Sequence, residues 1–309
     1  MHEPVLVREV IEKVCMPHFR IFLDGTFGMG GHSRALLEHY PQLKIVALDR
    51  DLESLNLAKK RFKENLNQNL FLFHQNFHDF REIKSQLTFC EFDGALLDLG
   101  FSSYQISAPH RGFSFQHEGP LDMRMDQSQS LTADEVVNTY SQESLADIFK
   151  TYGEEPFSRK IAKLICETRQ KARIPTTTAL ANLISMAAPR MGKSKIHPAT
   201  RVFQALRIFV NNELSSLAQS LEDMVRSLNA GGRLGVIAFH SLEDRMVKQS
   251  FFKFENPCIC PRNFVQCHCG EISLGCRVTK KPIVAGAAEI EHNPRSRSAR
   301  LRIFERRKT

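Results

Sequence analysis

Short apolar runs alternate with amphipathic segments over the first hundred residues. Four runs have the length of buried strands, at residues 21–24, 44–49, 70–74 and 92–100. A helix is predicted over about 53–64, between the second and third runs. Because strands that are buried on both faces lack polar alternation, these runs predict a parallel sheet with helices over both faces.

The pattern changes after residue 100. Residues 101–131 show no regular period, and the helical segments that follow have no strand between them. The first of these segments opens with a capping box, Thr132 to Glu135. The others are predicted near residues 158–173, 178–186 and 198–210, the last with Pro198 at its first helical position. These segments predict an inserted, all-helical region.

An α/β pattern then resumes. The next helix carries Leu214, Leu217, Leu221 and Val225 at helical spacing. We interpret Gly231-Gly232 as the stop of this helix and residues 233–240 as the following strand. The predicted fold class is therefore α/β, with a Rossmann-like domain of residues 1–105 and 211–309 that is interrupted by a helical insertion domain of residues 106–210.

A glycine-rich segment, Asp24-Gly-Thr-Phe-Gly-Met-Gly-Gly-His-Ser33, joins the first strand to the helix after it. Such a turn lets backbone amides approach a bound cofactor, although it can also serve the fold alone. Asp49 ends the next strand about twenty residues later, at the spacing of an acid that accepts from a ribose hydroxyl. Together these features favour an adenosine-containing ligand, while Asp49 taken alone can also cap the following turn.

The glycine spacing narrows the class of ligand. The dinucleotide pattern Gly-x-Gly-x-x-Gly, counted from Gly28 and Gly30, reaches Ser33 at its third position, which disfavours a nicotinamide or flavin ligand. An acid directly before the first glycine, here Asp24-Gly25, instead resembles the first motif of S-adenosylmethionine-dependent methyltransferases.

The amino-acid composition of the chain is basic overall. The 309 residues carry a formal net charge of +8, and the pI near 9.1 favours a polyanionic partner. Apolar residues alternate with Arg300 and Arg302 over 299–303, which predicts an edge strand whose cationic face contacts phosphate or protects the edge. The sequence shows neither a basic leader nor a run of membrane-spanning length, so a cytoplasmic protein is expected.

Longer motifs follow one another along nearly the whole chain. They are His2-Glu-Pro-Val-Leu, Asp24-Gly-Thr-Phe-Gly-Met-Gly-Gly-His-Ser33, Leu97-Asp-Leu-Gly-Phe-Ser-Ser103, Arg111-Gly-Phe-Ser-Phe115, Gly119-Pro-Leu-Asp-Met-Arg-Met125, Tyr152-Gly-Glu-Glu155, His197-Pro-Ala-Thr-Arg201, Phe203-Gln-Ala-Leu-Arg207 and Phe239-His-Ser-Leu-Glu-Asp-Arg245. In this order they resemble the MraW/RsmH family, which methylates the exocyclic N4 of a cytidine in bacterial small-subunit (16S) ribosomal RNA, near the decoding site, using S-adenosylmethionine.

The resemblance implies a fold, an activity and a partner. The fold is a class I S-adenosylmethionine-dependent methyltransferase sheet with an inserted helical domain. The activity is that of an rRNA (cytidine-N4)-methyltransferase. The partner is small-subunit ribosomal RNA or the assembling small ribosomal subunit, with the helical insertion in RNA recognition.

The resemblance also implies a set of cofactor-binding residues. They are Gly30, Gly31, His32, Asp49, Phe77, Asp98 and Gln105. Gly30, Gly31 and His32 are expected beside the methionine end of S-adenosylmethionine. Asp49 is expected on the ribose and Phe77 against the adenine. The alternatives are a His32 that only enters the helix and a Phe77 that only packs in the core.

Two residues are candidates for the chemistry, Asp98 and His240. Methyl transfer is an in-line displacement, so the site must align the amine and exclude water. A carboxylate that accepts from the cytosine amine would localise its conjugated lone pair and later take up a proton. Many enzymes that methylate DNA amines place an Asp/Asn-Pro-Pro-aromatic segment here. Residues 98–102 contain no Pro-Pro, so Asp98 serves the cofactor, the amine or both.

His240 follows the fifth predicted strand, at the edge of the sheet where the glycine loop is expected. It could orient the cytosine or relay a proton. Alternatively, this segment only begins a helix, with Ser241 as the cap and Glu243 and Asp244 in the first turn.

Four arginines in the family motifs are candidate RNA contacts: Arg111, Arg124, Arg201 and Arg207. Arginine pairs with phosphates or stacks on an unstacked base. A base within a folded RNA must leave its stack before it can be methylated. Some of the four are alternatively internal ion pairs, for example with Asp122 or Glu154.

Five of the eight cysteines cluster near the carboxyl end of the chain. Cys258, Cys260, Cys267 and Cys269 form a candidate zinc set, to which His268 could add a donor. Paired Cys-x-Cys is less typical of zinc than Cys-x-x-Cys, so a reduced loop without metal is the alternative.

Two other functions stay open at this point. A noncatalytic ribosome-assembly or RNA-binding factor would bind RNA without turnover. An NAD-dependent oxidoreductase would share the sheet and Asp49, but it would leave the missing third glycine and the later motifs unexplained.

Overall fold

The computed structural model describes residues 4–87, 91–188, 197–215, 217–261 and 268–307. The chain divides into two compact units, one of residues 1–100 and 215–309 and the other of residues 101–214. The boundaries predicted from the sequence, 105/106 and 210/211, fall a few residues inside the second unit. None of the described helices is both long enough and apolar enough to span a bilayer.

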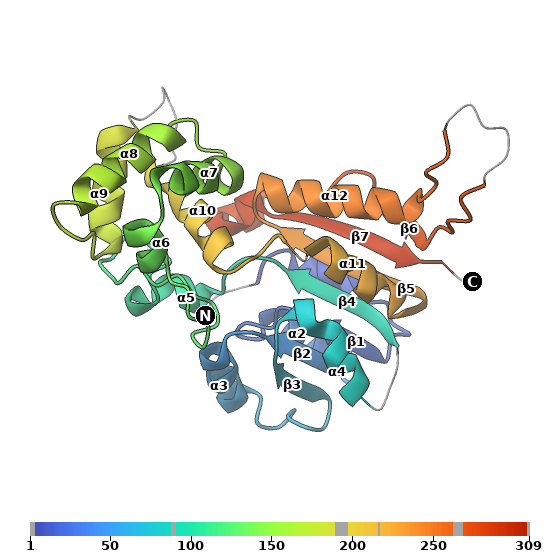
Figure 1. Ribbon diagram of the computed structural model, residues 1–309. Helices are drawn as coiled ribbons and strands as arrows, with labels where there is room; N and C mark the ends of the chain where they lie inside the picture. The colour runs from blue at the N-terminus through green and yellow to red at the C-terminus, as the bar shows by residue number, and fades with distance from the viewer. Residues whose placement is uncertain (1–3, 88–90, 189–196, 216, 262–267, 308–309) are drawn as a thin grey trace. The chain divides into compact units, whose positions relative to one another are not determined.

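The first unit is built on one sheet (Figure 1). Its strands are β1 (Ile21–Asp24), β2 (Lys44–Asp49), β3 (Leu70–His74), β4 (Phe92–Asp98), β5 (Leu228–Ala238), β6 (Gly275–Arg277) and β7 (Arg300–Arg306). Their order is β3-β2-β1-β4-β5-β7-β6. The first five strands of this order are parallel, and β7 is antiparallel to both β5 and β6. This arrangement confirms the predicted fold class, a class I methyltransferase sheet.

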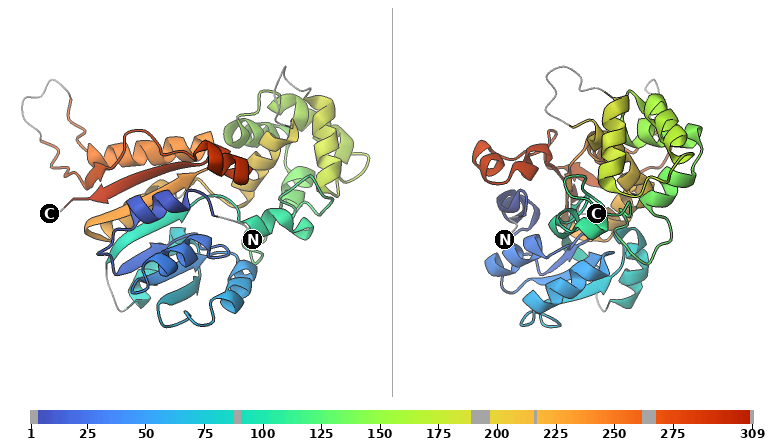
Figure 2. Two further views of the ribbon diagram at one scale, coloured as in Figure 1. Left: turned by 180° about the vertical axis from the view of Figure 1, so that it is seen from behind. Right: turned by 90° about the vertical axis from the view of Figure 1, so that its left-hand side faces the viewer.

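Helical segments cover both faces of this sheet, as the views from opposite sides show (Figures 1 and 2). They are α1 (Val7–Glu9), η1 (Val10–Val14), α2 (Gly31–His39), α3 (Leu52–Arg61), η2 (Phe77–Asp79), α4 (Phe80–Gln86), α11 (Leu217–Arg226), α12 (Ser241–Glu255), α13 (Ala287–His292) and η4 (Pro294–Ser298). One apolar core joins Val10 of η1 and Leu36 of α2 to Ile45, Leu96 and Ile303 of the sheet. Burial on both faces explains why the strands read as continuous apolar runs.

The glycine pair Gly231-Gly232 does not end a helix, contrary to the prediction. Helix α11 already ends at Arg226, and the glycines lie within β5. The register between β4 and β5 shifts at this place, and Gly231 has a φ of 84°. A Cβ on Gly232 would lie 2.8 Å from the carbonyl oxygens of Asn229 and Asp93. The glycines therefore allow an irregularity in the strand.

The prediction of an edge strand over 299–303 is also wrong. Strand β7 lies between β5 and β6, and Arg302 is buried. Its guanidinium donates to both oxygens of Asp244 on α12, at 2.7 and 3.1 Å, and Arg300 donates to the same carboxylate at 3.0 Å. Burial alone would raise the pKa of Asp244, but these hydrogen bonds outweigh it and lower the pKa. Both arginines therefore neutralise a buried acid.

The second unit is helical. Its segments are α5 (Ser103–Ser107), η3 (Pro109–Arg111), α6 (Ala133–Thr139), α7 (Gln142–Gly153), α8 (Ser158–Arg169), α9 (Thr177–Ala187) and α10 (Ala199–Val210). They enclose an apolar core that includes Phe149, Ile165, Leu180 and Leu206. The inserted helical region that the sequence predicts is thus confirmed.

Local signals account for most of these helix starts. The Thr132 hydroxyl accepts from the amide of Glu135 and caps α6. Pro198 stands at the cap of α10, one position earlier than predicted. Helix α7 was not predicted, because only Tyr140 and Ser141 separate it from α6. Its own signal is the Ser141 hydroxyl, which accepts from the amide of Ser144.

Candidate active site

The glycine loop leaves β1 and enters α2 at Gly31. Gly30 has a φ of 75°, and a Cβ there would lie 2.6 Å from ring carbons of Phe27 and Phe62. A Cβ on Gly31 would lie 3.0 to 3.3 Å from the ring of Pro4. Gly30 therefore requires glycine for the packing of the loop itself, whatever ligand the loop also approaches, while Gly31 is closely packed against Pro4.

Asp24, at the end of β1, is buried inside this loop. One carboxylate oxygen accepts from the Ser33 hydroxyl at 2.6 Å, and the other accepts from the Thr26 amide at 3.2 Å. Burial raises the pKa of Asp24 to about 6, although the hydrogen bond from Ser33 opposes the rise. Asp24 holds the loop together.

Asp49 fixes the other side of the loop. One carboxylate oxygen accepts from the Gly28 amide, and the other accepts from the Asp51 amide at 2.7 Å, just before α3. Burial raises the pKa of Asp49 to about 6. Two carboxylate oxygens offer about four acceptor positions in all, and these two bonds leave room for a ligand hydroxyl. The turn-capping role and the predicted ribose role are thus compatible.

Phe77 is the first residue of η2, directly after β3. Its side chain is buried, and a Cβ on Gly25 would lie 3.4 Å from the Phe77 Cβ. The Cβ of Phe77 therefore packs close to the start of the same loop, and its ring lies 4.2 Å from that of His78, measured between centroids. The carboxyl ends of β1, β2, β3 and β4 meet at one edge of the sheet, where ligands of open α/β sheets bind.

Asp98 lies at the end of β4 and carries a carboxylate oxygen without a partner among the described residues. Its amide donates to the Thr26 hydroxyl at 2.6 Å, which ties it to the glycine loop. The Oδ1 atom has no hydrogen-bond partner among the described residues, although the side chain is 26% exposed. Burial, followed by the charge of Glu243, raises the pKa of Asp98 to about 7. Such an acceptor is suited to a ligand or substrate.

His32 lies between Asp98 and the N-terminal segment. Its Nε2 is 2.8 Å from the carbonyl oxygen of Val5, and its Nδ1 is 3.6 Å from Asp98 Oδ2. Burial lowers the pKa of His32, so the neutral ring donates from Nε2 and turns its Nδ1 lone pair toward Asp98. The expected contact of His32 with the cofactor stays a prediction.

His240, Ser241 and Glu243 begin α12. The cap is His240 and not Ser241, because the His240 Nδ1 accepts from the Glu243 amide at 3.4 Å. Glu243 Oε2 accepts from the Phe239 amide at 2.9 Å, and Oε1 is 3.0 Å from His240 Nε2. The effect of Glu243 on the pKa of Asp98 could not be predicted from the sequence, because the two acids are far apart in the chain and meet only in the fold.

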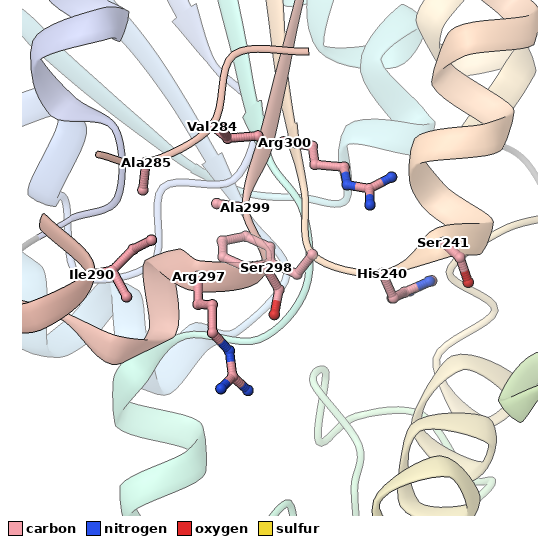
Figure 3. Close-up of a pocket in the computed structure, with 10 residues that line it drawn as sticks. His240, Ser241, Val284, Ala285, Ile290, Arg297, Ser298, Ala299 and Arg300 are labelled. Atoms are coloured by element: carbon pink, nitrogen blue, oxygen red, sulfur yellow. The ribbon is translucent and has the colours of Figure 1, made fainter. Parts of the chain in front are cut away.

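A hollow of about 400 Å³ opens beside this cap (Figure 3). His240 and Ser241 form one side, and Ile290, Arg297 and Ala299 lie across from them. The wall combines apolar side chains with cationic ones. Its cationic members are Arg297 and Arg300.

Three of the four arginines that are predicted to contact RNA bond groups within the second unit. They are Arg111, Arg124 and Arg207. Arg111 is 0% exposed and donates to the carbonyl oxygens of Arg124 and Met125, both at 3.0 Å. Arg124 donates to both oxygens of Asp122 at 2.9 Å, as the ion-pair alternative predicted. Arg111 therefore has a structural role, and its expected contact with RNA stays a prediction.

The other two candidates differ in exposure. Arg207 is buried, bonds Glu213 at 2.8 Å and lies 5.1 Å from the ring centroid of Phe101. Arg201 is exposed, and its guanidinium reaches the Glu154 carbonyl oxygen at 3.5 Å. Of the four, Arg201 is the one best placed to meet a polyanion.

Gln105 belongs to the second unit. It forms a capping box with Ser102 at the start of α5, in which Gln105 Oε1 accepts from the Ser102 amide at 2.8 Å. This bond gives Gln105 a structural role. Its expected contact with the cofactor stays a prediction.

The sequence model of the MraW methylase family matches residues 1–307. The chain belongs to the MraW methylase family. It is 45% identical over 305 residues to a ribosomal RNA small subunit methyltransferase H from Carboxydothermus hydrogenoformans, covering 99% of this chain and 97% of that protein. It is 46% identical over 307 residues to the protein of the same name from Caldicellulosiruptor bescii, with 99% of both chains covered.

The family membership predicted from the motifs is therefore confirmed. A solved rRNA methylase from Streptococcus thermophilus aligns with 98% of this chain and 93% of its own, at a TM-score of 0.39 and 11% identity. An alignment with so low a TM-score carries no argument about the fold. The fold of this chain follows from its own strand order.

Proposed function

We propose that this protein transfers the methyl group of S-adenosylmethionine to the exocyclic N4 of a cytidine in small-subunit ribosomal RNA. The observation that carries the chemistry is the free acceptor of Asp98 beside the glycine loop. The substrate class is supported by full-length relatives that are named for small-subunit ribosomal RNA. The N4 position is supported by the resemblance of the motifs. Such a substrate implies a cytoplasmic location.

The described residues fit this cofactor. Asp49 has acceptor capacity left for ribose hydroxyls, and Phe77 begins η2 after β3, at the same sheet edge, where its ring would pack against the adenine. Gly30, Gly31 and His32 would flank the methionine end. S-adenosylmethionine supplies an activated methyl group when it is bound, so the protein needs to provide alignment and a proton acceptor.

Asp98 is the proposed acceptor. An ionised Asp98 takes a hydrogen bond from the cytosine amine, which localises the nitrogen lone pair for attack. After transfer, the same carboxylate takes up the proton that the amine releases. A pKa of about 7 suits this role, because the carboxyl is partly ionised at neutral pH and still basic enough to accept a proton.

The deciding experiment is methyl transfer to two substrates, small-subunit RNA and assembled small subunits, both from a strain that lacks the modification. We expect labelled methyl incorporation at one cytidine and its mapping to N4. S-adenosylhomocysteine, and not NAD, should raise the melting temperature of the protein. RNA binding with no incorporation in either substrate would instead indicate the noncatalytic assembly factor.

Arg201→Ala should weaken RNA binding without changing the affinity for S-adenosylhomocysteine. One lost phosphate contact predicts a loss of roughly tenfold or less and a salt slope reduced by about 1. Filter binding at several salt concentrations measures both quantities. Arg159→Ala, which removes another exposed arginine of the same unit, is the matched control. Equal losses in the two variants would mean that Arg201 acts only through net charge.

A further inference from the structure

Three cysteines meet in the segment between α12 and β6, which the methyl transfer does not use. The Sγ atoms of Cys258, Cys260 and Cys269 all lie within 4.8 Å of one another. Cys276, the nearby fifth cysteine of the cluster, lies on β6 opposite Glu305 and is not in this group. Among the described cysteines of the cluster, three therefore lie together and Cys276 does not.

The spacing of the sulfur atoms is that of shared metal ligands. The Sγ atoms of Cys258 and Cys269 are 3.9 Å apart, about twice the length of a disulfide bond. Zinc–thiolate bonds of about 2.3 Å in a tetrahedron place neighbouring sulfurs ~3.8 Å apart. The observed distance therefore agrees with two thiolates on one tetrahedral ion.

Apolar packing does not account for the meeting of these thiols. The large apolar residues nearest to them in the described part of the loop, Ile259 and Ile272, are 77% and 78% exposed. Cys258 is itself exposed, and Cys260 and Cys269 are half-buried. A loop without a core of its own needs another source of order, and metal ligation is the usual one in small Cys-rich segments.

The backbone also supports a thiolate at Cys260. The amide of His268 donates to the Cys260 sulfur at 3.3 Å. A hydrogen bond to a ligating sulfur stabilises its negative charge and orients it. The imidazole of His268, which the sequence had offered as a further donor, does not belong to the group of ligand atoms that the structure brings together. Cys267, the remaining member of the predicted set, lies outside the described residues.

We propose that Cys258, Cys260 and Cys269 bind a structural Zn²⁺ ion that holds the loop between α12 and β6. Thiolates are soft ligands, which favour zinc over magnesium or calcium. Binding of the ion releases the thiol protons to solvent and changes no oxidation state. The site includes none of the residues proposed for methyl transfer, and the proposal does not depend on that function.

The test uses the full-length, untagged protein purified from zinc-supplemented cells. Elemental analysis should give about one zinc per chain for the wild type. Cys258→Ser and Cys269→Ser should each lose most of it, whereas Cys276→Ser should keep it. Replacement by Co²⁺ should produce a thiolate-to-cobalt charge-transfer band in the wild type and in Cys276→Ser, but not in Cys258→Ser.

Affinity for S-adenosylhomocysteine serves as the check on folding, and it should be the same in all four proteins. Zinc well below one equivalent together with no cobalt band in the wild type would overturn the proposal. Equal zinc in Cys258→Ser and Cys276→Ser would overturn it as well. A chelator should make the wild-type loop as sensitive to protease as the loop of Cys258→Ser, and unchanged resistance would count against the site.

Discussion

Asp98→Ala should reduce methyl transfer by a factor of about 10³, the middle of the range that a positioned proton acceptor contributes. The side chain carries the carboxylate oxygen that has no hydrogen-bond partner in the described part of the chain, next to the glycine loop. Single-turnover rates with saturating cofactor measure the loss. Removal of the carboxylate also removes its contact with His32, so the affinity for S-adenosylhomocysteine must be measured in parallel.

Asp98→Asn separates the two roles of this residue. The amide still accepts a hydrogen bond, but it cannot take up a proton, so its rate should be far below that of the wild type and independent of pH near neutrality. The wild-type rate should rise as pH increases through about 7, because the carboxyl must be ionised to accept from the amine. Normal turnover by Asp98→Asn would exclude Asp98 as the proton acceptor.

Two controls tie this profile to Asp98. Because the charge of Glu243 helps to raise the pKa of Asp98, Glu243→Gln should move the midpoint of the pH–rate profile to lower pH. The folded-state pKa also lies above the unfolded value of about 3.9, so ionisation of Asp98 destabilises the fold as pH rises between these values. Asp98→Asn should therefore raise the melting temperature at pH 8 and leave it unchanged near pH 3.

Asp49→Ala should weaken the binding of S-adenosylhomocysteine by about 100-fold, or ~2.7 kcal/mol, the size of one or two charge-assisted hydrogen bonds. The carboxylate both holds the Gly28 amide and has acceptor capacity left for ribose. Calorimetry measures the affinity. Affinity in the wild type should also fall as pH decreases through about 6, because protonation of Asp49 removes acceptor capacity.

Asp51→Ala is the matched control for Asp49. Asp51 caps α3 by accepting from the Glu53 and Ser54 amides, so its loss should cost about 1 kcal/mol of stability and leave the ligand affinity unchanged. Equal losses of affinity in the two variants would show that Asp49 acts through the loop and not on the ribose.

Strand positions could be predicted from the sequence because the signal for them is local. The bounds of β2 and β3 agree with the predicted 44–49 and 70–74. A strand buried on both faces is a continuous apolar run, and the turn residues that follow mark its end. The end of β4 could be predicted from the same kind of local signal. Asp98 could therefore be placed at the edge of the sheet where ligands bind.

The role of a charged residue could not be predicted, because its partner lies elsewhere in the chain. Arg302 meets Asp244 from 58 positions away. Arg111 is buried against the carbonyl oxygens of residues 124 and 125, and no periodicity shows such a contact. The pattern of Arg and apolar residues in β7 is equally typical of an exposed edge and of a strand whose arginines face a buried acid.

Strand β7 also constrains the order in which the protein can become complete. The chain emerges from its amino end, so the strands β1 to β5 and the whole helical unit exist before residues 300–306 do. Until then one side of β5 has no partner strand, and Asp244 has neither of its two arginines. Until β7 has formed, β5 thus offers an open strand edge to neighbouring chains, and the pairing of β7 with β5 closes that route to aggregation.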